Sequence, residues 1–233
     1  MRDLYHGLIV FWSVYLGIGY FMPINNMKVR NNIKITYNKI IIRLFYNMIA
    51  SGCVVPLIYC IQKIIEYLWY SVIPREPLAP VKIITFLWFN YLIKYLIALI
   101  MIEIWFYYSH RLMHKFFYRL HKDHHAFIRP CALAGLYCSS FEMVFVNQLS
   151  VTLPFQLLDF SYNEVLIFSI LIALNVLKGH AGLHERDDIP KWIPQIMIQS
   201  IDHDTHHNDM ISNFGILYLL DRIHGTYKPS SPL

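Results

Sequence analysis

Ten of the twelve histidines in this chain fall into four short clusters. The clusters are His110-x3-His114, His121-x2-His124-His125, His180-x3-His184 and His203-x2-His206-His207. On a helix, side chains three and four positions apart share a face, so each cluster directs two or three imidazoles towards one point. Imidazole is a good ligand for iron, zinc, copper and nickel. Because ten imidazoles exceed the needs of one ion, the pattern predicts two metal ions in a shared site.

The first two clusters are expected to lie on one continuous helix over residues 110–125. At about 100° per residue, their five histidines then fall within a stripe roughly 100° wide. Glu103 lies in the same stripe, and an acid inside an apolar run is a candidate functional group, although a structural hydrogen bond to a neighbouring helix is an equal alternative. Lys94 lies on the opposite face and is expected to extend towards lipid headgroups.

The composition indicates a membrane protein. Of the 233 residues, 56% are hydrophobic and only 15% are charged, which is too apolar for an ordinary soluble enzyme. The net charge of +5 comes from scattered lysines and arginines, so a nucleic acid is excluded as a partner and an anionic membrane surface is favoured. The expected fold class is an all-α, integral membrane helical bundle with a histidine-rich cap that holds two metals.

Apolar runs at residues 4–22, from residue 44 onwards and at 83–108 are long enough to be candidate spans, and two shorter runs at 143–158 and 165–177 form a hairpin. The basic, acid-free stretch 28–43 is expected in the cytosol. With this topology, all four clusters reach the cytosolic face. We therefore expect a single membrane-embedded domain over 1–233, with N-terminal anchor spans in 1–82 and the histidine-bearing core in 83–233.

The histidine motifs resemble those of the fatty-acid hydroxylase and sterol desaturase superfamily of integral membrane di-iron enzymes. The family's H-x3-H, H-x2-H-H and final H-x2-H-H motifs are matched here by His110 to His114, His121 to His125 and His203 to His207. Asn213-Phe-Gly215 and the stretch from Leu220 to Thr226 are similar to its closing signature. The stretch from Pro130 to Tyr137, followed by Phe141-Glu142 and Asn147, is most similar to the 4-methyl sterol oxidase branch, whereas the third cluster is closer to carotenoid and fatty-acid hydroxylases.

This resemblance implies two iron ions, with metal ligands at His110, His114, His121, His124, His125, His180, His184, His203, His206 and His207. The implied activity is O2-dependent hydroxylation, desaturation or methyl oxidation of a sterol or fatty-acyl lipid from the bilayer, as in a methylsterol monooxygenase or a fatty acid hydroxylase. The implied electron donor is a separate protein such as cytochrome b5 with an NAD(P)H-dependent reductase, and the implied location is the endoplasmic reticulum.

Acids beside the ligands are candidates for orienting imidazole N–H groups, as metal-bound histidine requires. Asp123 and Asp204 are the leading candidates, together with Glu103, and Asp202 and Asp209 are further ones.

Two other functions remain open at this point. The same histidines could serve a non-enzymatic membrane metal binder or transporter, or a catalytically degenerate relative. A transporter should place ionisable residues near the bilayer midplane on broken helices. Here nearly all the candidate ligands follow apolar runs, which favours the enzyme.

Overall fold

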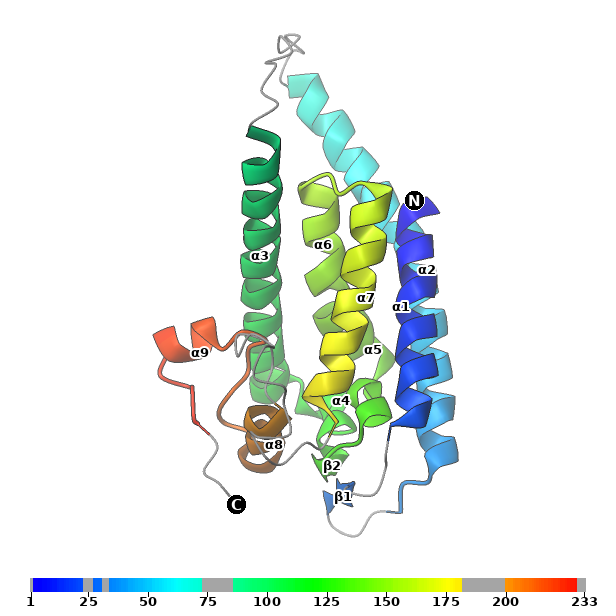
Figure 1. Cartoon of the computed structure of the whole chain (residues 1–233), viewed down its shortest axis with the longest axis vertical. Helices are drawn as coiled ribbons and strands as arrows, with labels where there is room; N and C mark the ends of the chain where they lie inside the picture. Colours follow the sequence, from blue (N-terminus) through cyan, green and yellow to red (C-terminus); the bar gives the residue numbers. More distant parts are fainter. Residues whose placement is uncertain (1, 23–26, 31–33, 73–85, 182–199, 230–233) are drawn as a thin grey trace.

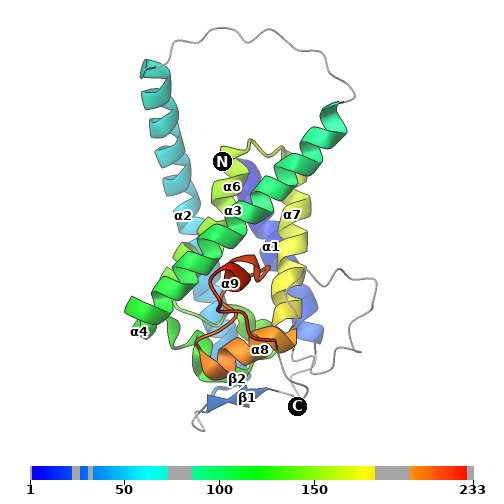
Figure 2. The same ribbon diagram turned by 90° about the vertical axis from the view of Figure 1, so that its left-hand side faces the viewer.

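The fold is a bundle of long helices with the histidine segments gathered at one end (Figure 1). The computed structural model describes residues 2–22, 27–30, 34–72, 86–181 and 200–229. Helices α1 (Arg2–Phe21), α2 (Tyr37–Val72), α3 (Phe86–Phe116) and α7 (Tyr162–Gly179) run along the long axis. The view turned by 90° shows that α3 and α2 diverge towards the far end, with α1, α6 and α7 between them (Figure 2).

Four described helices are long and apolar enough to cross a membrane, namely Arg2–Phe21, Tyr37–Ile61, Tyr91–Phe116 and Tyr162–Gly179. Their outward faces are apolar: Ile42, Leu57, Leu96 and Ile167 are 49–58% exposed. In water such surfaces would be costly, whereas in a bilayer they face lipid. The predicted all-α membrane bundle is therefore confirmed.

The predicted hairpin between the second and third clusters is present. Its first arm contains α5 (Ser140–Glu142), the π-helical segment η4 (Met143–Gln148) and α6 (Leu149–Leu157), and its second arm is α7. At the turn, Lys94 Nζ of α3 donates to Asp159 O at 2.9 Å and to Glu164 Oε2 at 3.0 Å. Lys94 therefore pairs with the hairpin, because a partly buried ammonium gains from a carboxylate partner, and its extension towards lipid headgroups stays a prediction.

Short elements form the histidine-bearing end. They are β1 (Lys28–Val29), α4 (Tyr118–His121), η2 (His124–Ala126), β2 (Phe127–Arg129), η3 (Ala132–Leu136), α8 (Ser200–Asp209) and α9 (Leu219–Ile223). Strands β1 and β2 pair antiparallel, with Lys28 opposite Arg129. This pairing joins the segment that follows α1 to the segment that follows the second histidine cluster.

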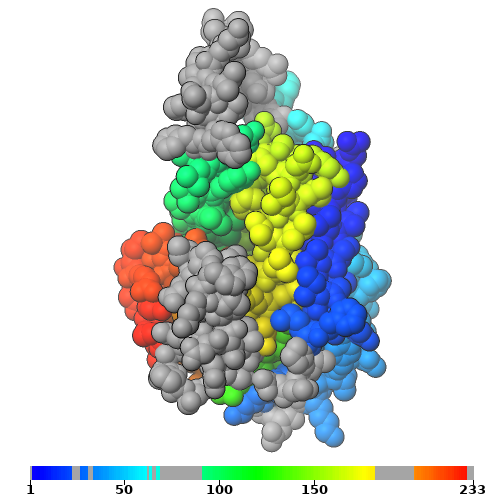
Figure 3. Space-filling view, in the orientation of Figure 1, coloured from blue at the N-terminus to red at the C-terminus, as the bar shows by residue number. Residues whose placement is uncertain are grey.

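The main hydrophobic core joins α1, α2 and α7 to the short elements. Trp12, Tyr15, Leu44, Phe127 and Leu177 are buried in it. The Tyr15 hydroxyl accepts from Leu136 N at 3.1 Å and lies 3.0 Å from Ala132 O, so α1 also holds η3 by hydrogen bonds. A space-filling view shows the surfaces of α1, α7 and α3 side by side, with α9 beside the lower end of α3 (Figure 3).

Helices α1 and α7 approach closely where α1 has a glycine. A Cβ atom built on Gly7 would lie 2.6 Å from Val165 Cγ1 and 2.9 Å from Ser169 Oγ, whereas one on Gly17 has nothing within 4 Å. We therefore expect Gly7→Val to lower the free energy of unfolding by about 1–3 kcal/mol, the usual cost of overpacking. Gly17→Val is the matched control and should leave stability nearly unchanged in denaturant unfolding of the purified protein in detergent. Equal effects of the two substitutions would contradict this packing.

Candidate metal centre

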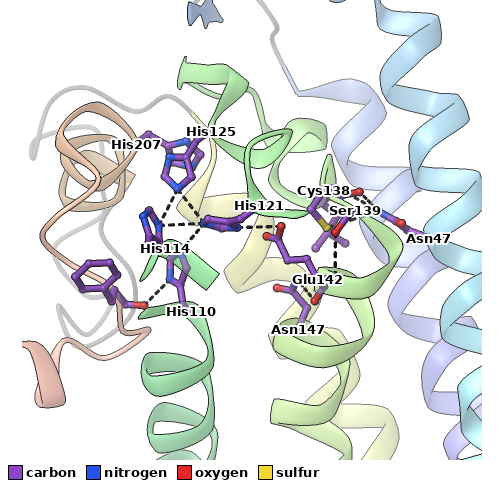
Figure 4. A network of polar contacts seen from close by, with 12 residues as sticks. Asn47, His110, His114, His121, His125, Cys138, Ser139, Glu142, Asn147 and His207 are labelled. Atoms are coloured by element: carbon purple, nitrogen blue, oxygen red, sulfur yellow. Dashed lines mark hydrogen bonds and ion pairs between the residues drawn. The ribbon is translucent and has the colours of Figure 1, made fainter. Parts of the chain in front are cut away.

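The described histidine clusters converge into two adjacent groups. In each group, the candidate ligand atoms lie within 4.8 Å of one another. The first group contains His110, His114, His121, His125 and His206, and the second contains His124, His180, His203 and His207. Nine of the ten expected ligands are thus brought together, and His184 lies outside the described residues. Figure 4 shows four rings of the first group pointing towards one another from α3, α4 and η2.

The chain reaches this arrangement by folding back after α3. The continuous helix expected over residues 110–125 is wrong: α3 ends at Phe116, the short α4 ends at His121, and a 3-10 turn begins at His124. The reason is geometric, because a straight helix would separate residues 110 and 125 by about 22 Å at 1.5 Å per residue. The turn brings His110, His114, His121 and His125 together in the first group and places His124 in the second.

Backbone carbonyls hold the outward-facing nitrogens of four rings. In each pair, the Nδ1 atom of the histidine donates to an oxygen at 2.6–3.0 Å. The pairs are His110 with Phe214 O, His180 with Val176 O, His206 with Ser212 O and His207 with Phe127 O. A neutral imidazole carries one proton, so a proton held at Nδ1 leaves Nε2 as a free electron pair. These rings are therefore oriented as Nε2 ligands, the arrangement that metal-bound histidine usually shows.

The Nε2 atoms of neighbouring rings face one another at hydrogen-bond distance. His121 Nε2 lies 3.1 Å from His110 Nε2, 3.0 Å from His114 Nε2 and 2.9 Å from His125 Nε2. In the second group, His203 Nε2 lies 2.8 Å from His180 Nε2. Facing electron pairs in a desolvated space are unfavourable unless a cation lies among them, so the donor set fits a metal ion in each group.

Burial keeps these imidazoles uncharged. Desolvation lowers the pKa of His180 to about 4, and it lowers the pKa values of His121, His203 and His206 well below the usual value, with neighbouring histidines adding to the effect. Metal binding requires the neutral form. Protons therefore compete weakly with a metal ion in this site at neutral pH.

Glu142 is a site residue to which the sequence analysis assigned no role. Its Oε2 atom lies 2.9 Å from His121 Nδ1, and both side chains are buried (Figure 4). Burial, with a contribution from Asp123, raises the pKa of this carboxyl well above its usual value. The contact places a carboxyl group beside the outward-facing nitrogen of His121, the position that carbonyl oxygens occupy at four other rings. The sequence signal for this residue is the stretch Phe141-Glu142, which forms part of the resemblance to the 4-methyl sterol oxidase branch.

Gly135 allows the close approach of His180. A Cβ atom at this position would lie 2.6 Å from His180 Nδ1 and 2.7 Å from its Cγ. Any larger residue would therefore push the imidazole away from the second group. The helix η3, which carries Gly135, is held from the other side by Tyr15 and Asn47.

Glu103 supports the site from a distance. Its Oε2 atom accepts from the backbone N–H groups of Ile216 and Leu217 at 2.8 Å each. In the same loop, Asp221 accepts from Phe214 N at 2.9 Å and from Gly215 N at 2.7 Å. The two carboxylates thus fix the loop whose Phe214 carbonyl holds His110, and the closing signature noted in the sequence supplies half of this support.

The other candidate acids have different surroundings. Asp123 forms an ion pair with Arg43 at 2.6 Å. Asp209 accepts from Ser212 Oγ at 2.9 Å and so holds the turn whose carbonyl orients His206. Desolvation raises the pKa of Asp204 to about 7, and Arg129 opposes this shift.

The first group meets the surface of the described structure at His114, which is only partly buried. A groove of about 520 Å³ opens there. Its lining residues are Arg111, His114, Lys115, Tyr118, Met210, Ile211, Phe214 and Thr226. The groove combines an apolar wall with a basic rim beside a candidate ligand.

The region of the chain that contains the histidine groups matches a known protein family. The sequence model of the fatty acid hydroxylase family matches residues 95–226, a region that contains both histidine groups. No solved structure matches the chain.

Several curated proteins match the same part of the chain. A very-long-chain aldehyde decarbonylase of Oryza sativa subsp. indica is 28% identical over 58% of this chain and 55% of its own length. Fatty acid hydroxylase domain-containing protein 2 of Homo sapiens is 29% identical over 58% of this chain and 39% of its own length. A sphinganine C4-monooxygenase of Arabidopsis thaliana is 28% identical over 59% of this chain and 55% of its own length. The chain thus spans about half, or less, of the length of these relatives.

The contact between Glu142 and His121 yields a test of the metal centre. We expect Glu142→Ala to weaken metal binding by about 10- to 100-fold, because groups that orient a ligating imidazole typically contribute that much. Glu142→Gln keeps an acceptor for the Nδ1 proton and should weaken binding less. The measurement is a titration of the metal-free protein with Fe2+ in the absence of O2.

Asp123→Asn provides the control for that titration. Asp123 directly precedes the candidate ligand His124, but its carboxylate pairs with Arg43. This variant should bind Fe2+ like the unaltered protein. If Asp123→Asn and Glu142→Ala weaken binding equally, the contact with His121 has no special role.

Proposed function

The chain belongs to the fatty acid hydroxylase family, and on this premise we propose that it is a membrane-bound oxidoreductase that uses O2 to modify a lipid from the bilayer. The observation that carries the proposal is the convergence of nine imidazoles into two groups with adjoining rings. His125 of the first group and His207 of the second have ring centroids only 4.9 Å apart. Two ions held in this way would lie close enough to act on one substrate.

We assign one iron ion to each group. When bound, the pair would supply activation of O2 and oxidation of an unreactive C–H bond, for which protein side chains alone have no chemistry. The donor set is all nitrogen in both groups, whereas soluble di-iron proteins use glutamates and Glu-x-x-His pairs. The proposed electron donor is a separate protein such as cytochrome b5 with its NAD(P)H-dependent reductase.

The protein's own part in the reaction is to orient the candidate ligand imidazoles and to exclude water from them. The carbonyls of Phe127, Val176, Ser212 and Phe214 keep protons on Nδ1 and free electron pairs on Nε2. Burial of the rings keeps water away from the ligand atoms, which limits side reactions of an oxidising centre. The groove at His114 offers the substrate and O2 a route to the first group.

The proposed substrate is a lipid with an acyl or sphingoid chain. The matching proteins carry names that refer to fatty acids, sphinganine and very-long-chain aldehydes. The resemblance to the 4-methyl sterol oxidase branch stays a prediction, so sterols belong in the same assay. Hydroxylation is the proposed reaction to test first, followed by desaturation and methyl oxidation.

We further propose that the histidine end faces the cytosol, in the endoplasmic reticulum of a eukaryotic cell. Residues 28–30 and 34–43 of the basic segment adjoin this end, in agreement with the positive-inside tendency. Within the single domain, residues 1–82 would anchor and brace the protein and residues 83–233 would carry the reaction.

Lipid profiling of cells that express the intact chain tests the proposed function. We expect an oxidised lipid to accumulate with the unaltered chain and to fall by more than about 100-fold with His124→Ala or His206→Ala, since loss of a ligand should exceed the effect of its outer partners. His224→Ala is the control, because this exposed histidine bonds to Tyr108 and lies in neither group. Profiles that are the same for all four proteins would contradict the enzyme assignment for the lipids measured.

A second measurement distinguishes the proposed enzyme from a metal binder or transporter. Purified protein loaded with iron should consume O2 when a reductant and a lipid extract are supplied. Stable iron binding without such uptake would favour the non-enzymatic alternative or a degenerate relative.

A further inference from the structure

A single arginine from the N-terminal segment contacts both histidine groups. Arg30 directly follows β1, far from the candidate ligands in sequence. Its Nη2 atom donates to His207 O at 2.6 Å and to Asn208 O at 3.4 Å, and its Nε atom donates to His125 O at 3.3 Å. His125 belongs to the first group and His207 to the second. One guanidinium therefore bridges the backbone of a candidate ligand from each group.

The bridged residues lie where the two groups adjoin. The ring centroids of His125 and His207 are 4.9 Å apart, and those of His124 and His207 are 4.6 Å apart. His124-His125 and His206-His207 each supply one ligand to each group, so a change in the distance between these two backbones would change the geometry of both groups. Arg30 is placed where its contacts with both backbones can set that distance.

The chemistry of the contact suits an arginine. His207 and Asn208 lie in the last turn of α8, where carbonyl groups lack helical partners and carry partial negative charge. A guanidinium is permanently charged, and its donors point in fixed directions from a rigid plane. It can therefore hold two carbonyl groups at a defined distance, which a flexible ammonium does less well.

The pairing of β1 with β2 also links the N-terminal segment to the second histidine group. Strand β1 pairs with β2, and the Phe127 carbonyl of β2 accepts from His207 Nδ1 at 3.0 Å. Arg30 lies outside residues 95–226, the region that matches the family.

We propose that Arg30 is a positioning residue that fixes the distance between the two histidine segments that build both imidazole groups, so that the family-matched region depends on the N-terminal segment for a correctly spaced pair of ions. This inference rests on the metal binding in the proposed function, but not on the lipid or the reaction. Its consequence is that loss of Arg30 should affect how the two ions interact as well as how tightly they bind.

The test uses the full-length protein in detergent, freed of metal and titrated with Co2+. The variants are Arg30→Gln, Arg30→Lys and the control Lys28→Gln, which removes the same charge from an exposed residue of β1. Two readouts are taken: the Co2+ dissociation constants from visible absorption, and the magnetic coupling between the two bound ions from electron paramagnetic resonance. The helical circular dichroism signal and the melting temperature report the fold separately.

We expect Arg30→Gln to weaken Co2+ binding by about tenfold, the lower end of the range for outer partners of metal ligands, and to reduce the coupling. Arg30→Lys should recover part of the affinity, since an ammonium can still reach the end of α8, but not the full coupling. Lys28→Gln should match the unaltered protein in both readouts.

Three results would overturn the proposal. The first is unchanged affinity and coupling in Arg30→Gln. The second is a loss of binding that only follows the loss of folded protein, with full recovery in Arg30→Lys, which would show general support of the fold by a positive charge. The third is the absence of Co2+ binding by the unaltered protein, which would also overturn the proposed metal centre and so distinguishes the two failures.

Discussion

The structure depends on one electrostatic constraint, the meeting of unprotonated imidazole nitrogens in a buried space. His121 Nε2 has three other Nε2 atoms within 2.9–3.1 Å. Such an arrangement of electron pairs is repulsive in itself, and burial removes the water that would relieve it. Protonation is opposed by burial, as the lowered pKa values of His121 and His125 show. A metal cation in each group would resolve this repulsion, and the surrounding contacts would hold the imidazoles in position to bind it.

The groups that contact the outward-facing ring nitrogens come from parts of the chain that lie far apart in sequence. The carbonyl that orients His110 comes from Phe214, and the one that orients His207 comes from Phe127. The carboxyl group of Glu142 lies at the corresponding nitrogen of His121. Because each anchor belongs to a different element, the site needs the long helices to bring the element ends to one place. The apolar bundle thus fixes the ends of α3, α7 and α8 near one another. The short segments between them supply the groups that orient the individual rings.

The sequence predicted the large features because they follow from composition and spacing. The apolar runs predicted the long helices and the hairpin, and the histidine spacing predicted that the clusters would meet. The continuous helix through residues 110–125 failed because helical periodicity describes which face a residue shares, not how far along the axis it lies. The contacts of Arg30, Gly135 and Glu142 were not predictable from one sequence, since each joins positions whose proximity is created by the fold. Asp123 is a related example, because its partner Arg43 is 80 residues away.

The contrast between the anchored side of the site and its edge at His114 has a functional consequence. His121, His125 and His206 are buried and held in place, whereas His114 borders a groove with Met210 and Phe214 in its wall. A centre that oxidises lipids must keep water from its ligands and still admit an apolar chain. Anchoring on the buried side would satisfy the first requirement, and an opening at His114, the partly buried member of the nine described candidate ligands, would satisfy the second. Phe214 both lines the groove and, through its carbonyl, orients His110, so a molecule that displaces Phe214 in the groove would also disturb the position of the His110 ring.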